Sequence, residues 1–261
     1  MSIYNSPYTG APSVTGIMIG QPWNLTPDAK GDVWVANGYT YFNGSRAVTE
    51  FKPPFTASST PAVTITNGIG AATEGVAFDH SGDLFVATWG NREVLEYTPP
   101  FSNSSSPTVT ITNGITGPEG LAVDASGNLW VANYGSSQNV VEFTPPFSNA
   151  SVPALTISTG ITGPQTLAFN SSGDLFVADE GSNTVLEYAP PFSNASAPVA
   201  TISSSLTDVE ALALDSHGNL YVSNRSTNTV YEFKPPYSNS STPSATLTNG
   251  ITKPWGITFA R

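Results

Sequence analysis

Short apolar runs recur along the chain, and each is bounded by Gly, Pro, Asn or Ser. Upstream of every "PPF" or "PPY" lies a run such as "DVWVAN", "DLFVAT" or "NLWVAN", followed by a second run such as "VTEF" or "VLEY". After it, an Asn/Ser/Thr-rich loop leads to a third kind of run, such as "AVTITNGI". These runs are rich in β-branched and aromatic residues, and none shows sustained helical periodicity, so we predict β-strands.

The runs belong to an internal repeat of about 45 residues. The PPF or PPY landmark begins at Pro53, Pro99, Pro145, Pro190 and Pro235. Each copy holds four runs, and the first two are joined by a tight turn such as "DASG". Four antiparallel strands per repeat are typical of a propeller blade. Because one blade cannot bury both of its faces alone, we expect neighbouring blades to stack around an axis.

The stretch "GPEGLAVDASGNLWVANYGSSQNVVEF" resembles an NHL-type repeat. Such blades read roughly P-x-G-[IV]-A-V-D, then G-N-[IL]-[WY]-V-A-[DN], then N-x-V-x-x-[FY]. The resemblance covers nearly the whole chain and implies a β-propeller. It implies no single function, because such propellers include binding modules, lyases and hydrolases.

We therefore predict an all-β protein with one domain, a six-bladed propeller of four-stranded antiparallel blades. The predicted blades are 22–69, 70–115, 116–161, 162–206 and 207–251, with 252–261 and 1–21 as the closing blade. No second strand of the "NLYVSN" type exists for this closing blade. It is either three-stranded, with residues 1–4 beside the C-terminal strand, or the chain is a piece of a longer propeller. In the second case the open edge pairs with another chain.

Composition restricts the partners. The net charge is −11 and only 10% of residues are charged, which argues against nucleic acid or an anionic membrane. The absence of cysteine excludes disulfides and thiolate metal sites. There is no signal-peptide pattern and no apolar stretch of 18 residues, so we expect a protein that does not insert into membranes. We also expect it to be a monomer. We expect it outside the cytoplasm or in the cell envelope, with any export signal already removed.

One position in every repeat opens the innermost strand, and we expect it to encircle the mouth of the central channel. It is occupied by Trp23, Glu74, Glu119, Gln165, Glu210 and Trp255. A second predicted ring ends the second strands, at Asn37, Thr88, Asn133, Asp179 and Asn224. All-oxygen ligands suit Ca²⁺ or Mg²⁺, and the candidate metal ligands are Glu74, Glu119, Asp179 and Glu210. Crowded carboxylates would also raise one another's pKa, as acid–base chemistry requires. Packing and solvation alone are the alternative.

Aromatic residues gather in loops on the same predicted face. Blade one carries the long loop "NGYTYFNGSRA", with Tyr39, Tyr41 and Phe42. Equivalent loops hold Trp89 and Tyr134, and basic residues nearby are Arg92 and Arg225. Aromatic platforms with polar neighbours suit a sugar, a peptide or a protein partner. The alternative is that these rings cover blade seams.

Both histidines, His80 and His217, lie in the tight turns of the opposite face, so no Ser/His/Asp arrangement forms around them. The first hypothesis is thus a non-catalytic ligand-binding or scaffold propeller that uses the channel mouth and the aromatic loops. The alternatives are a divalent-metal-dependent hydrolase or lyase at the same mouth, and a propeller fragment that self-assembles.

Overall fold

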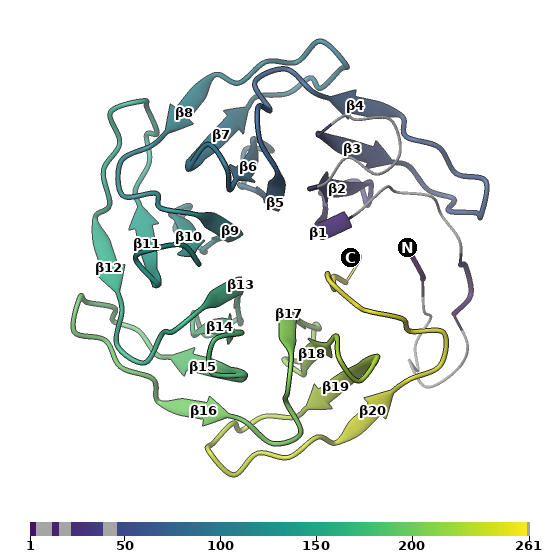
Figure 1. Ribbon diagram of the computed structural model, residues 1–261. Coiled ribbons are helices and arrows are strands. Elements are labelled where there is room, and N and C mark those ends of the chain that lie inside the picture. Colours follow the sequence, from purple (N-terminus) through teal and green to yellow (C-terminus); the bar gives the residue numbers. More distant parts are fainter. Residues whose placement is uncertain (4–11, 16–21, 39–45, 260–261) are drawn as a thin grey trace.

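The computed structural model describes residues 1–3, 12–15, 22–38 and 46–259 and shows five four-stranded antiparallel sheets arranged around a central axis (Figure 1). The first blade holds β1 (Pro22–Pro27), β2 (Val33–Asn37), β3 (Ala47–Phe51) and β4 (Val63–Ile65). The second holds β5 (Thr73–Phe78), β6 (Leu84–Thr88), β7 (Glu93–Tyr97) and β8 (Val109–Ile111). The third holds β9 (Pro118–Val123), β10 (Leu129–Asn133), β11 (Asn139–Phe143) and β12 (Leu155–Ile157). The fourth holds β13 (Pro164–Phe169), β14 (Leu175–Asp179), β15 (Thr184–Tyr188) and β16 (Ala200–Ile202). The fifth holds β17 (Val209–Leu214), β18 (Leu220–Asn224), β19 (Thr229–Phe233) and β20 (Ala245–Leu247).

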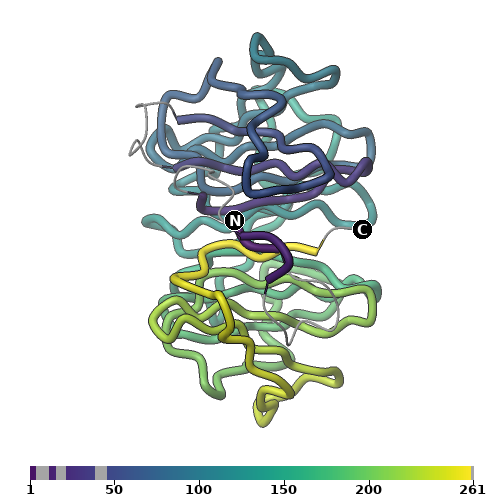
Figure 2. Tube along the Cα trace, turned by 90° about the vertical axis from the view of Figure 1, so that its right-hand side faces the viewer, coloured from purple at the N-terminus to yellow at the C-terminus, as the bar shows by residue number. Residues whose placement is uncertain are grey.

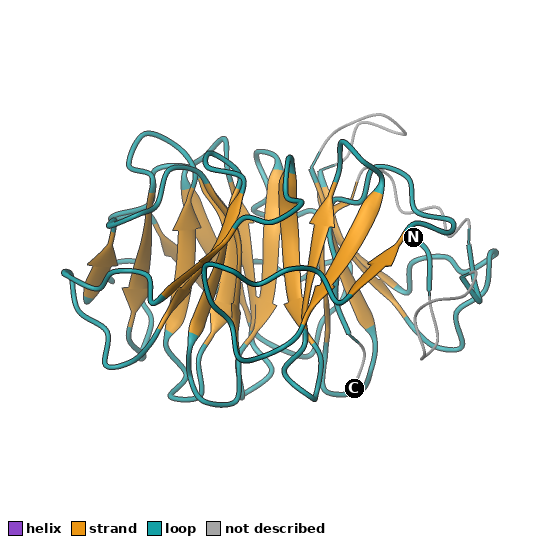
Figure 3. Cartoon of the chain, turned by 90° about the horizontal axis from the view of Figure 1, so that it is seen from below, coloured by secondary structure: helices purple, strands orange, loops and turns teal. Residues whose placement is uncertain are grey.

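Tight turns join the first and second strands of each blade, because an Asp or Asn side chain organises them. In blade two, Asp79 Oδ1 accepts hydrogen bonds from the amides of Ser81 at 2.9 Å and Asp83 at 2.8 Å. This bonding pattern is an Asx turn, which favours a sharp reversal. The strands therefore run along the propeller axis and the loops gather on two opposite faces (Figure 3).

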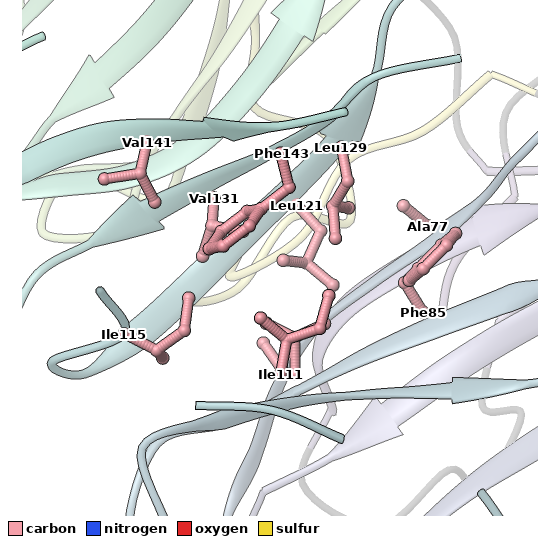
Figure 4. Close-up of a cluster of buried hydrophobic side chains, with 11 residues drawn as sticks. Ala77, Phe85, Ile111, Ile115, Leu121, Leu129, Val131, Val141 and Phe143 are labelled. Atoms are coloured by element: carbon pink, nitrogen blue, oxygen red, sulfur yellow. The ribbon is translucent and has the colours of Figure 1, made fainter. Parts of the chain in front are cut away.

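The hydrophobic core lies between blades rather than within one. Figure 4 shows the seam of blades two and three, where Phe85 and Ile111 pack against Leu121 and Phe143. The aromatic residues of the second strands are almost completely buried: Trp34, Phe85, Trp130, Phe176 and Tyr221. Stacking thus supplies the burial that one blade cannot provide, as the repeat pattern predicts.

The prediction of six blades is wrong, since the structure has five. The sector between β17 and β1 holds two chain ends (Figures 1 and 2). Residues 252–259 form no described strand there, and the described N-terminal residues form only the isolated bridge between Ile3 and Val14. A blade needs a second strand to satisfy the backbone of the first, and residues 252–261 and 1–21 carry no such sequence.

Among the described residues, aromatic side chains of the C-terminal segment pack on both neighbouring blades in this sector. The ring centroids of Trp255 and Trp23 lie 4.3 Å apart, and those of Phe259 and Tyr221 lie 4.9 Å apart. The last residues therefore contact both blade one and blade five. Met1, Ile3 and Val14 pack on the buried face of blade one. Among the described residues, no helix has the length and apolar character to span a membrane.

Candidate functional site at the channel mouth

A β-bulge at the start of each innermost strand positions the candidate residues. In blade two, Thr73 pairs with Thr88 and Val76 pairs with Val86, so β5 has one residue more than β6 between these pairs. Glu74 and Gly75 occupy this bulge. The same irregularity recurs in β1, β9, β13 and β17. Bulges redirect side chains, and here the redirected side chains line the channel.

Eight residues line one pocket at the channel mouth: Trp23, Asn24, Glu74, Glu119, Gln165, Thr166, Glu210 and Trp255. They include all six residues that the repeat alignment places in the first ring. Sequence analysis did not select Asn24 and Thr166, although each follows a ring residue directly. The space that a water-sized sphere can enter is about 10 Å³, which is room for one water-sized group.

Two glycines bring the carboxyl-bearing strands together. A Cβ atom at Gly75 would lie 2.0 Å from the carbonyl oxygen of Glu119. A Cβ at Gly120 would lie 2.3 Å from the carbonyl oxygen of Gln165. The obstructing atoms are backbone, so any larger residue must push neighbouring innermost strands apart. The glycine of each Glu-Gly pair therefore has a geometric role, because it lets the next innermost strand approach.

The three glutamates of the ring hold their protons unusually strongly. Burial raises the pKa of Glu74 to about 7. Burial first, and then the charges of Glu74, Glu180 and Glu210, raise the pKa of Glu119 to about 9. Burial also raises the pKa of Glu210 to about 8, although Arg225 opposes this increase. Near neutral pH these carboxyl groups therefore titrate instead of remaining fully ionised.

Glu74 differs from the other two in having a side-chain oxygen that is both buried and unpaired. The residue is 7% exposed, and its Oε2 atom is buried without a hydrogen bond. Buried polar atoms are normally paired, and an unpaired acceptor costs about 1–3 kcal/mol. A buried acceptor that lines a pocket is a feature of binding sites.

The Glu210 side of the mouth contains its own cation. Arg225 Nε lies 3.0 Å from Glu210 Oε1 and 3.2 Å from Asp208 Oδ2. The Arg225 guanidinium carbon lies 4.3 Å from the centroid of the Trp255 ring. Nearby, Gln165 Nε2 donates to Glu180 Oε2 at 3.1 Å. Glu180 and Asp208 are thus additional polar residues around the mouth, which sequence analysis did not select.

The second predicted ring is buried and bonded to backbone rather than open to the pocket. Asp179 accepts hydrogen bonds from the amides of Thr162 and Gly163 and from the hydroxyls of Thr162 and Ser182. Asn133 accepts from the Thr116 amide and donates to the Gly114 carbonyl. In blades three and four these side chains fasten the loop that leads into the innermost strand.

The four candidate metal ligands are not brought together. The described residues contain two groups of three carboxylates with oxygens within 4.8 Å of one another, Asp28–Asp32–Glu50 and Glu180–Asp208–Glu210. Arg225 already pairs with two carboxylates of the second group. Neither group is the predicted set of Glu74, Glu119, Asp179 and Glu210, so the residues do not fit a Ca²⁺ or Mg²⁺ site of that composition.

Two of the aromatic candidates, Trp89 and Tyr134, lie at seams between blades. Trp89 is 45% exposed, and its Nε1 lies near Gly117 of blade three. Tyr134 similarly lies beside Gly163 of blade four, and its hydrogen bond with Glu180 raises its pKa to about 12. Both rings therefore touch the next blade, as seam covers do. Tyr39, Tyr41 and Phe42 fall outside the described residues.

Arg92 occupies a left-handed turn, with φ of 57°, and its amide donates to the Trp89 carbonyl. Its side chain is exposed and makes no ion pair among the described residues. Arg92 thus shapes its turn, whereas Arg225 contacts the mouth directly.

Several solved propellers share this fold at low sequence identity. A periplasmic gluconolactonase of Pseudomonas aeruginosa is 19% identical, with a TM-score of 0.67, over 89% of this chain and 74% of that one. A Lactobacillus plantarum protein has a TM-score of 0.69 at 17% identity, over 93% and 75%. Virginiamycin B lyase of Staphylococcus aureus has a TM-score of 0.59 at 12% identity, over 92% and 75%.

No family model and no curated protein sequence matches the chain, so the resemblance to NHL repeats stays a prediction. At these identities the solved structures establish the β-propeller fold and nothing about activity.

Proposed function

We propose that this chain is a ligand-binding propeller whose channel mouth takes the end of a ligand that brings positive charge or hydrogen-bond donors. The observation that carries the proposal is Glu74, a buried carboxyl group that lines the pocket with an unpaired oxygen. A donor on a ligand would satisfy this oxygen and recover the free energy of the missing hydrogen bond.

The surrounding groups favour the same function. Glu119 and Gln165 offer further oxygen atoms, while Trp23 and Trp255 add aromatic faces at the rim. Binding needs no nucleophile, and both histidines lie in exposed turns that follow the other ends of the innermost strands β5 and β17. Trp89, Tyr134 and Arg92 would enlarge the contact surface for a peptide, protein or carbohydrate.

Isothermal titration calorimetry tests this proposal with a panel of an amine, CaCl₂, MgCl₂, glucose and gluconolactone. We expect at least one compound to bind the native chain and to bind Glu74→Gln at least tenfold more weakly. Glu142→Gln is the matched control, because Glu142 lies on a third strand away from the pocket. Equal affinities in the native chain and Glu74→Gln would contradict the proposed site.

A second candidate is hydrolysis of a lactone or similar ester. The sequence-based hypothesis included a divalent metal, but the four predicted ligands do not form one close group among the described residues. Glu74 favours it, because a carboxyl group whose burial raises its pKa to about 7 suits a general base. Two of the structural neighbours are named for gluconolactone or streptogramin cleavage, which supports the idea only by analogy of fold.

A pH-stat assay separates the two candidates. Glucono-δ-lactone is added with and without Ca²⁺ or Mg²⁺, and acid release is compared with the spontaneous rate. Hydrolysis that Glu74→Gln abolishes would favour the enzyme. Acid release at the spontaneous rate under all conditions would leave binding as the function.

A further inference from the structure

The C-terminal segment 254–259 lies in the place of an innermost strand, although it forms no strand itself. Its sequence "PWGITF" matches "TEGVAF" of β5 and "PEGLAV" of β9. A Cβ atom at Gly256 would lie 3.1 Å from the carbonyl oxygen of Trp23 in β1. Gly75 of β5 meets the Glu119 carbonyl oxygen of the next innermost strand in the same way. The segment therefore packs on β1 as one innermost strand packs on the next.

Phe259, at the end of the segment, contacts the preceding blade as its equivalents do. Its ring centroid lies 4.9 Å from that of Tyr221 in blade five. In blade two, the ring of Phe78 at the end of β5 lies 5.7 Å from the ring of Trp34 in blade one. The packing of the segment thus follows the repeat on both of its sides.

The outer edge of the segment has no strand beside it among the described residues. In blade two, Val76 and Phe78 of β5 pair with β6. The corresponding stretch of the segment holds Gly256, Ile257 and Thr258, which are partly buried and form no hydrogen bond with any described residue. Backbone groups away from water are normally paired. A further strand placed along this edge would therefore gain hydrogen bonds.

The N-terminal residues lie in the same sector, farther from the propeller axis than the C-terminal segment (Figure 1). Ile3 and Val14 form an antiparallel bridge and pack on β2 of blade one. In blade one, Val48 of the third strand and Ile65 of the fourth pair with each other and pack on β6 of the next blade. The sector thus holds counterparts of a first, a third and a fourth strand. None of the described residues provides a counterpart of the second.

Phe55 indicates which side chain such a second strand would bring. In the later repeats, the aromatic residue of the PPF or PPY loop packs against an aromatic second-strand residue of the preceding blade. The ring centroids are 4.9–5.2 Å apart in the pairs Trp34–Phe101, Phe85–Phe147, Trp130–Phe192 and Phe176–Tyr237. Phe55 is the equivalent residue of blade one, and it has no aromatic ring against it in the described part of the chain. An aromatic residue on an added strand would supply this contact.

We infer that the edge of residues 256–258, together with Phe55, binds an extended β-strand of a partner protein. The strand would carry an aromatic residue between apolar ones, as "LFVA", "LWVA" and "LYVS" do in the second strands of this chain. Its backbone would pair with Ile257, and its aromatic ring would cover Phe55. Strand addition of this kind takes affinity from main-chain hydrogen bonds and specificity from alternate side chains.

A folded second copy of this chain is a poor donor of such a strand. The second strands of the described blades are β2, β6, β10, β14 and β18, and each is buried between two strands of its own blade. The donor is therefore a segment of a different protein that is extended before it binds. This inference does not depend on the ligand of the channel mouth.

Titration of the native chain with a labelled peptide, followed by fluorescence anisotropy, tests the inference. The peptide copies residues 217–225, "HGNLYVSNR". We expect a dissociation constant of about 100 μM or lower. Two variants of the peptide, numbered as in the chain, should bind about tenfold more weakly. Val222→Pro removes a backbone donor of the strand, and Tyr221→Ser removes the ring.

Variants of the chain locate the binding site. Phe55→Ala should weaken peptide binding about fivefold, as the loss of one aromatic pair implies. Val152→Ala is the matched control, because Val152 is 63% exposed on blade three, and its affinity should equal that of the native chain. Thermal melts establish that both variants are folded. In the native chain, bound peptide should slow hydrogen exchange at the amides of residues 256–258.

Each result supports or overturns the inference. Absence of binding at about 1 mM peptide would overturn it. So would equal affinity of the Val222→Pro peptide, or unchanged exchange at residues 256–258 in the bound chain. A dimer of the native chain that excludes the peptide would overturn the assignment to a different protein. Glu74→Gln should leave peptide affinity unchanged, so failure at this edge and failure at the channel mouth are distinguishable.

Discussion

The two sides of the channel mouth have the same ring residue and different electrostatics. Glu74, Glu119 and Glu210 occupy equivalent bulges, yet within the described part of the chain only Glu210 forms an ion pair with a cation. The difference comes from the residue that follows each second strand. It is Arg225 after β18, whereas Trp89 follows β6 and Tyr134 follows β10. Equivalent repeats can therefore share the same ring glutamate, while the residue after the second strand decides whether a cation pairs with it.

The seams on the two sides also differ. Gly75 and Gly120 follow the unneutralised glutamates and contact the next innermost strand through backbone. The equivalent residues on the other side are Thr166 and Ala211. There, Thr166 Oγ1 accepts a hydrogen bond from the Leu212 amide at 3.0 Å. Neighbouring innermost strands therefore approach closely on the side where Glu74 and Glu119 have no ion pair among the described residues.

The largest expected effect comes from widening the seam between the innermost strands β9 and β13. Gly120→Ala would place a Cβ 2.3 Å from the Gln165 carbonyl oxygen and 2.7 Å from Thr166 Cα. We expect a decrease of about 3 kcal/mol in the free energy of unfolding, since backbone must shift on both sides. Urea unfolding measures it, with Ala211→Gly as the control at about 1 kcal/mol. An unchanged midpoint in Gly120→Ala would show that the seam yields without strain.

The next effect is a dependence of stability on pH. In the folded chain, burial raises the pKa of Glu74 to about 7, Glu210 to about 8 and Glu119 to about 9, above the ordinary value of 4.5. Below pH 4.5 both states are protonated, and this contribution is fully present. It is lost as pH rises to about 9, because the folded chain must ionise buried groups.

We therefore expect the free energy of unfolding to fall continuously between pH 5 and pH 9. Glu119→Gln should flatten the profile more than Glu232→Gln, a third-strand control. Glu96, whose pKa burial raises to about 7, contributes in the same window. The same slope in Glu119→Gln and the native chain would refute the raised pKa of Glu119.

A smaller effect on stability is expected when the cation beside Glu210 is removed. Arg225→Gln leaves Glu210 and Asp208 without their cation, and we expect a loss of about 2 kcal/mol at pH 8. The side chain of Arg225 is 32% exposed, so solvent moderates the loss. The loss should shrink at pH 5, where Glu210 is protonated. Arg92→Gln is the control and should change stability by less than about 0.5 kcal/mol.

The smallest effect concerns the aromatic loops. Trp89 is 45% exposed and lies beside Gly117, so we expect Trp89→Ala to cost less than about 1 kcal/mol. Ligand affinity then distinguishes its two interpretations. Unchanged affinity for the compound that binds the native chain would make Trp89 a seam cover, while a fivefold loss would extend the binding site to this loop.

Much of the site was predictable because the repeat is local. A strand of four to six residues and its turn are specified by neighbours in sequence, so equivalent positions such as Glu74 and Glu119 share one place in the fold. Asp179 shows the limit of this reasoning. Its sequence position suggested a metal ligand, yet three hydrogen bonds from the preceding loop and one from the Ser182 hydroxyl engage its oxygens. Those partners lie up to 17 residues away, beyond any local pattern.

The sequence by itself determined the strands, their order within a blade, the positions of the ring residues and the stacking of blades. Alternating apolar residues and Asp or Gly turns act over a few residues, and every copy repeats them. Only the tertiary structure decided that the described blades number five and that the described part of the final segment contacts blades one and five through aromatic rings. It also decided which glutamate meets Arg225. The first two depend on contacts between different blades, which are set only when the ring assembles. The ion pair joins neighbouring strands of blade five, and its geometry is set when Arg225 packs against Trp255.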